Sequence, residues 1–127
     1  MTYEERRRFP RLPLDVGVDF VVLSQPGTGA GHELFTTGSK NLSLGGICIL
    51  VFEKLKTGDA LELKFSIPGL DRFIVAKGRV VWLGKLRVGG VETDKAYEVG
   101  VEFVEINQPD KEKIQAYVSS KLPPDSP

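Results

Sequence analysis

Apolar and polar residues alternate with a period of two through most of the chain, and no other feature restricts the fold as strongly. The segments 16–22, 61–67 and 97–103 show this alternation most clearly. Side chains with a period of two lie on alternate faces of a strand, so one face can be buried while the other meets solvent. Glycine, proline and asparagine separate the segments and indicate turns. We expect six strands, at 16–22, 34–43, 46–52, 61–67, 73–83 and 97–103.

The period changes near the C-terminus, where the sequence predicts a helix over residues 107–122. Asn107 can cap the first turn, and the charge of Asp110 suits the positive end of a helix. One apolar stripe follows at helical spacing, formed by Ile114, Tyr117, Val118 and Leu122. Strands followed by one helix predict an all-β fold with one C-terminal helix, a six-stranded antiparallel β-barrel. Residues 123–127, which begin with two prolines, are expected to form a disordered tail.

Composition restricts the classes of function. A length of 127 residues and a formal net charge of zero predict one domain rather than a uniformly basic nucleic-acid binder. The single cysteine, Cys48, excludes an internal disulfide, and the single histidine, His32, leaves too few ligands for a zinc site. A catalytic Ser-His-Asp or Cys-His set also lacks support, so we expect no enzyme. No apolar run approaches the roughly 20 residues of a membrane span, and the N-terminus lacks a signal-peptide pattern, which predicts a cytoplasmic location.

An arginine cluster precedes the first expected strand. Residues 4–13, EERRRFPRLP, contain four of the seven arginines in the chain. Two prolines disfavour a helix here, so we expect residues 1–13 to form a flexible arm. Arginine binds phosphate through two parallel hydrogen bonds and stacks on flat rings, which favours an anionic, aromatic ligand. The alternative interpretation is a solvated basic tail that Glu4 and Glu5 partly neutralise.

A second polar segment, NLSLGG at residues 41–46, lies between the second and third expected strands. In an extended chain, Asn41 and Ser43 are two residues apart and point to the same face. Gly46 lets the backbone bend, adopt a positive φ or approach a ligand closely. The alternative is an ordinary bulged turn in which Asn41 and Ser43 bond to nearby backbone groups.

These two segments together resemble the signature of the PilZ family of bacterial cyclic di-GMP receptors. That signature is Arg-x-x-x-Arg, followed later in the chain by Asp/Asn-x-Ser-x-x-Gly. The first part fits here at Arg7 and Arg11, and the second part fits at Asn41, Ser43 and Gly46. Many family members have Asp at the position of Asn41, and Asn is an accepted variant.

The resemblance extends through GRVVWLG (78–84), YEVGVEFVEI (97–106) and the segment after it, and so covers nearly the whole chain. It implies that residues 14–122 form one PilZ domain, which consists of the barrel and the C-terminal helix. It also implies a receptor that changes conformation on binding and signals through an unidentified protein partner, in processes such as motility or biofilm formation. The implied cyclic di-GMP site consists of Arg6, Arg7, Arg11, Asn41, Ser43, Gly46 and Trp82. The alternative function is a PilZ-fold protein-interaction module that binds nucleotide weakly or not at all.

Finer expectations concern single residues. Arg6 directly precedes the arginine motif, and the resemblance implies that an arginine there favours a stacked pair of ligands. We therefore expect two cyclic di-GMP molecules per chain, no cofactor, no bound nucleic-acid polymer, and a monomer or weak homodimer. Trp82 is expected to line the base site, with the core or the sheet surface as the alternative. Cys48 is expected in the core and His32 in solvent.

Overall fold

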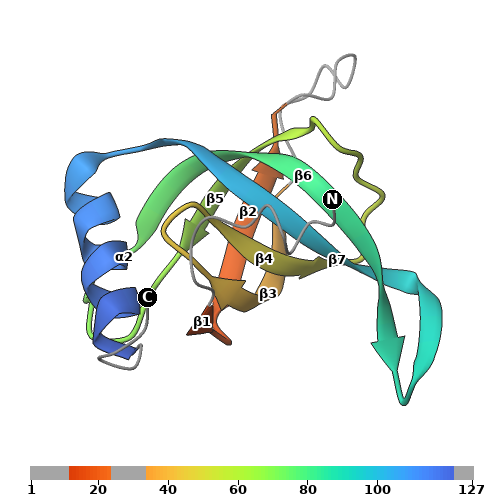
Figure 1. The fold of residues 1–127 in the computed structure, drawn as a ribbon. Coiled ribbons are helices and arrows are strands. Elements are labelled where there is room, and N and C mark those ends of the chain that lie inside the picture. The colour runs from red at the N-terminus through yellow and green to blue at the C-terminus, as the bar shows by residue number, and fades with distance from the viewer. Residues whose placement is uncertain (1–11, 24–33, 122–127) are drawn as a thin grey trace, which may run out of the picture.

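A computed structural model describes residues 12–23 and 34–121 of the chain. Within these ranges the secondary structure consists of short and long strands followed by a C-terminal helix (Figure 1). The elements are β1 (Leu12–Pro13), β2 (Gly17–Val22), β3 (Leu34–Leu42), β4 (Gly46–Val51), β5 (Ala60–Phe65), β6 (Ile74–Val88), β7 (Val91–Ile106) and α2 (Gln108–Lys121).

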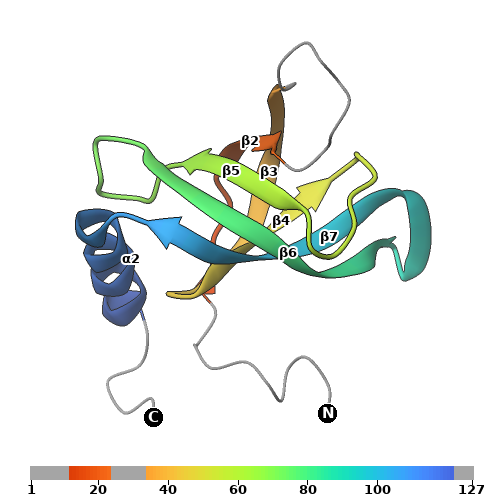
Figure 2. The ribbon, with the colours of Figure 1, turned by 90° about the horizontal axis from the view of Figure 1, so that it is seen from above.

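The strands form a closed antiparallel barrel. Neighbouring strands follow the order β3-β2-β5-β6-β7-β4, and the additional pairing of β4 with β3 closes the circle, as Figure 2 shows from above. The short β1 pairs antiparallel with the C-terminal end of β3. The expected all-β class, a six-stranded antiparallel barrel with one C-terminal helix, is confirmed.

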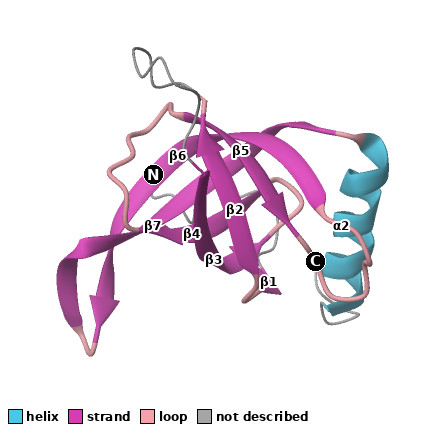
Figure 3. Ribbon diagram, turned by 180° about the vertical axis from the view of Figure 1, so that it is seen from behind, coloured by secondary structure: helices cyan, strands magenta, loops and turns pink. Residues whose placement is uncertain are grey.

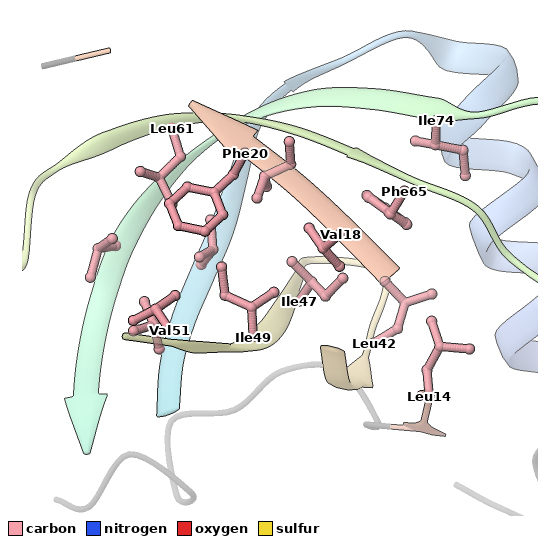
Figure 4. Close-up of a cluster of buried hydrophobic side chains, with 14 of the residues drawn as sticks. Leu14, Val18, Phe20, Leu42, Ile47, Ile49, Val51, Leu61, Phe65 and Ile74 are labelled. Carbon is pink, nitrogen blue, oxygen red and sulfur yellow. The ribbon is translucent and has the colours of Figure 1, made fainter. Parts of the chain in front are cut away.

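The core fills the inside of the barrel with the inward-facing residues that the alternating pattern predicts. Val18, Phe20 and Leu63 are fully buried, and Figure 4 shows how such side chains from facing strands meet. Burying a side chain of this kind contributes about 1.5–3 kcal/mol relative to leaving it in water. Because a shift of one residue would turn these side chains to the outside, the core fixes the register of the strands.

Strands β6 and β7 are longer than the sequence pattern predicts, since they extend over 74–88 and 91–106 rather than 73–83 and 97–103. Gly89 and Gly90, with φ of 60° and 83°, form the tight turn between them. Two residues with positive φ match the right-handed twist of the flanking strands. The end of this hairpin projects beyond the barrel (Figure 1).

Helix α2 lies against one end of the barrel (Figure 3). The Asn107 side chain caps it as predicted, because its Oδ1 accepts a hydrogen bond from the Asp110 N–H at 2.8 Å. Ile114 and Val118 of the predicted stripe are buried. The Asp110 carboxylate is also buried and pairs with Arg72, which the sequence pattern did not indicate. Among the described residues, no helix is long and apolar enough to cross a membrane.

The described chain enters the barrel beside the end of β3. Leu12 lies opposite Leu42, and Pro13 lies opposite Asn41, so the last two residues of the expected arm belong to the sheet. The buried Ser39 hydroxyl fixes the next residues, since it accepts a hydrogen bond from the Val16 N–H at 3.1 Å and donates one to the Leu14 carbonyl at 2.5 Å. The expectations for residues 1–11, the loop 24–33 with His32, and the tail 123–127 lie outside the described residues.

Candidate functional site

Four predicted site residues lie in the described part of the chain, and the sheet brings two of them into one row. Asn41 on β3 lies opposite Cys48 on β4, Cys48 lies opposite Gly100 on β7, and Gly100 lies opposite Trp82 on β6. Directly opposed residues of antiparallel strands point to the same face. We call these four residues the outer row. The other three predicted residues, Arg6, Arg7 and Arg11, lie outside the described residues.

The outer row lies on the outside of the barrel. Ile47 and Ile49, which flank Cys48 on β4, are buried in the core, and so are Val99 and Val101, which flank Gly100 on β7. Because side chains alternate along a strand, Cys48 and Gly100 face the opposite way. Cys48 is nevertheless only 1% exposed. Cys48 thus belongs to the buried hydrophobic residues, as predicted, although its side chain points to the outer face of the strand, which alternation alone could not indicate.

Trp82 lies over Gly100 rather than in the core. A Cβ atom added at Gly100 would lie 1.9 Å from the Trp82 Nε1 and 2.3 Å from its Cε2, so the indole fills the space where a side chain would be. At its other end, the Cζ3 atom lies 3.6 Å from the position of a Cβ added at Gly84. The half-buried indole thus lies on the outer face. We call Gly100 its seat, because the missing side chain of this glycine leaves the space that the ring occupies. The sequence analysis missed Gly100 because its role depends on the cross-strand register.

The turn between β3 and β4 is held by its own hydrogen bonds. The Ser43 N–H donates to the Gly46 carbonyl at 2.9 Å, and the Ser43 hydroxyl donates to the same oxygen at 3.4 Å. The Phe103 N–H donates to the Gly45 carbonyl at 2.9 Å, which ties the turn to β7. Ser43 therefore has the local role that the bulged-turn interpretation predicts.

Gly46 is required by a close approach within the protein. A Cβ atom added there would lie 2.2 Å from the carbonyl oxygen of Val101 on β7. Its φ lies outside the left-handed region, which only Gly58, Gly69, Gly89 and Gly90 occupy among the described residues. Of the roles expected for Gly46, a positive φ is thus excluded, and the backbone that it approaches is that of the neighbouring strand.

Two carboxylates flank the outer row, and each is paired with a cation. Glu98 and Glu102 lie two residues to either side of Gly100 on β7 and so share its face. The Lys40 ammonium donates to the Glu98 Oε1 at 2.5 Å, and the Arg79 guanidinium lies 3.7 Å from the Glu102 Oε1. The hydrogen bond to Glu98 raises the pKa of Lys40 above its ordinary value, against the lowering effect of burial.

The chemistry of this face favours binding. It combines a half-buried indole, an amide and two ion pairs, and the accessible part of an aromatic ring can stack a planar base. Within residues 12–23 and 34–121, no cluster of three or more His, Cys, Asp or Glu side chains could hold a metal ion.

Comparisons with known proteins give the family. The PilZ domain family model matches residues 5–120. No curated protein sequence matches the chain. Among solved structures, the Bacillus subtilis inhibitor of motility MotI/DgrA has a TM-score of 0.70 and 22% identity, over 91% of this chain and 51% of that one. The PilZ domain of Escherichia coli YcgR with c-di-GMP has a TM-score of 0.68 and 17% identity, over 91% and 90%.

A third similar structure is the MrkH–c-di-GMP complex of K. pneumonia, with a TM-score of 0.68 and 16% identity, over 91% of this chain and 51% of that one. This chain therefore spans about half the length of MotI/DgrA and of MrkH. At these identities the three structures support the fold alone.

We predict that Gly46→Ala lowers the free energy of unfolding by at least about 2 kcal/mol, because the new Cβ meets a carbonyl that cannot move without disturbing the β4–β7 pairing. Urea denaturation measures the change. Gly17→Ala is the control, since an added Cβ there meets no atom within 4 Å and should change stability by less than about 0.5 kcal/mol. Equal effects of the two substitutions would contradict this account of Gly46.

Gly100→Ala should displace the indole of Trp82, which is the only tryptophan in the chain. We expect its fluorescence emission to move to longer wavelength as the ring enters solvent, with a loss of about 1–3 kcal/mol of stability. Gly38→Ala is the control, because the nearest atom to its added Cβ is the Val16 carbonyl oxygen at 3.9 Å. Identical emission spectra of the wild type and Gly100→Ala would show that Gly100 does not seat the indole.

Proposed function

The chain belongs to the PilZ domain family, and we propose on this basis that it is a cyclic di-GMP receptor that signals through a protein partner. In this proposal it is a cytoplasmic adaptor without catalytic activity, and the dinucleotide is its ligand rather than a cofactor. Its partner acts in a process such as motility or biofilm formation. The proposed ligand is the one with which two proteins of similar fold, the YcgR domain and MrkH, are described.

The observation that carries the proposal is the outer row. Asn41, which fits the second part of the signature, shares one face of the sheet with the seated indole of Trp82. An amide can donate to and accept from a base edge or a phosphate, and an indole can stack on a guanine. Barrel closure thus gathers two kinds of contact that a nucleotide needs.

In this proposal, the arginines that fit the first part of the signature supply positive charge for the phosphates, because the two cations that flank the outer row are paired with carboxylates. Cyclic di-GMP carries two phosphates and two guanines, and a guanidinium can form two hydrogen bonds with a phosphate or with the O6 and N7 atoms of guanine. Arg11 directly precedes β1, whose Leu12 and Pro13 pair with the end of β3. The residue after Arg11 thus lies opposite Leu42, one position from Asn41. We propose that Arg7 and Arg11 hold the ligand over the outer row and that binding orders this part of the chain.

Replacing Arg7 or Arg11 with Ala should weaken cyclic di-GMP binding by at least about 2 kcal/mol, the usual loss when one partner of a charged pair is removed. Calorimetric titration measures the affinity. Arg8→Ala is the matched control, because Arg8 belongs to the same cluster but fits neither motif position, and we expect it to cost less than about 1 kcal/mol. Unchanged affinity in both Arg7→Ala and Arg11→Ala would refute the site. A wild type that does not bind would favour the interaction-module alternative.

We propose that two cyclic di-GMP molecules bind per chain as a stacked pair, with Arg6 in contact with the second ligand through its guanidinium plane. Calorimetry of the wild type should saturate at two ligands per chain. Arg6→Leu should shift the stoichiometry towards one and weaken binding, because a leucine cannot bond to a guanine edge. Saturation of the wild type at one ligand would refute the role of Arg6 and leave Arg7 and Arg11 in place.

A further inference from the structure

The ion pair between Lys40 and Glu98 lies at the border of the outer row. The register of β3 against β4 shifts between Ser39 and Asn41, so Lys40 is the additional residue of a β-bulge. Bulges redirect side chains. The Lys40 ammonium reaches across β4 to the Glu98 carboxylate on β7. The pair therefore connects the residue before Asn41 to the residue two positions before Gly100.

Both charges remain accessible at this border. The Lys40 side chain is 52% exposed and the Glu98 side chain is 21% exposed. A ligand bound over the outer row would meet this ammonium together with its carboxylate.

Such a pair can exchange partners at little cost. Exposed Lys–Glu pairs contribute little to stability, because water and salt screen the attraction. A phosphate competes well for an ammonium that has three donors on a flexible stem. The carboxylate, in contrast, repels a phosphate that comes close. Glu98 thus restrains Lys40 in the empty protein and opposes an anionic ligand.

We propose that Lys40 leaves Glu98 and binds a phosphate of the dinucleotide, so that the Lys40–Glu98 pair sets the affinity of the site. This inference rests on the proposed function, because the phosphate belongs to cyclic di-GMP. It assigns opposite effects to two residues that are hydrogen-bonded to each other. Lys40 strengthens binding, and Glu98 weakens it.

The exchange is tested by calorimetric titration with cyclic di-GMP of variants in which one charged residue is replaced by an uncharged residue of similar size. Lys40→Met should weaken binding about tenfold, since it removes a charge-assisted hydrogen bond to the ligand. Glu98→Gln should tighten binding about three- to tenfold, since it frees Lys40 and removes a repulsive charge. In the double variant, Glu98→Gln should have a smaller effect than in the wild type, because no ammonium remains to be released.

The Lys77–Glu105 pair supplies matched controls. It is also exposed and joins the same two kinds of side chain, with its atoms 3.7 Å apart, but Glu105 lies at the C-terminal end of β7, whereas Glu98 lies in the middle of the strand. Lys77→Met and Glu105→Gln make the same charge changes and should each alter affinity less than about twofold. Circular dichroism should show that all variants keep the fold.

The outcomes separate this inference from the proposed function. If the wild type does not bind cyclic di-GMP, both are refuted. If the wild type binds and Glu98→Gln behaves like Glu105→Gln, only the exchange is refuted. Weaker binding by Glu98→Gln would also overturn it, because Glu98 would then contact the ligand instead of competing with it. Tighter binding by Glu98→Gln with weaker binding by Lys40→Met would support it.

Discussion

The barrel closes where β3 pairs with β4, with Asn41 opposite Cys48 and Leu42 opposite Ile47. This pairing determines both the interior and the candidate site. Leu42 and Ile47 complete the core, while Asn41 and Cys48 begin the outer row. A slip of one residue would exchange the two faces, so it would expose the leucine and bury the amide. The energy that stabilises the core therefore also holds Asn41 on the face of Trp82.

Closure leaves little room between neighbouring strands, and glycine is placed where contact is closest. A Cβ added at Gly46 would collide with Val101, and one added at Gly78 would collide with Val101 and Glu102. A Cβ added at Gly100 would collide with Trp82. All three contacts involve β7, the strand between β6 and β4. The same strand presents Glu98 and Glu102 on its outer face, each paired with a cation. The described surface around the row is thus balanced in charge, and in our proposal the arginines of the N-terminal segment provide the excess that binds phosphate.

Local patterns in the sequence predict the elements well, because alternation and capping depend on neighbours along the chain. Such patterns correctly predicted the strands, the helix cap at Asn107 and the buried stripe with Ile114 and Val118. The projecting end of the β6–β7 hairpin was missed, since its mixed residues lack a regular alternation. The seat at Gly100 and the reach of Lys40 to Glu98 were also missed, because both depend on which residues face each other across strands. The family signature led to the prediction of Asn41, Ser43 and Gly46 as site residues, and it did not reveal that Gly46 is constrained by β7.

The central claim is that this face of the barrel binds cyclic di-GMP, and a titration of the wild-type chain tests it most directly. Calorimetry and the fluorescence of Trp82 would be followed together, with cyclic di-AMP and GTP as competing ligands. The account predicts saturable binding of cyclic di-GMP and a change in Trp82 emission with the same midpoint. Cyclic di-AMP and GTP should bind at least about 100-fold more weakly, because the site recognises both the guanine edges and the two phosphates of its ligand. Absence of binding, equal binding of all three nucleotides, or binding without any change in Trp82 emission would contradict it.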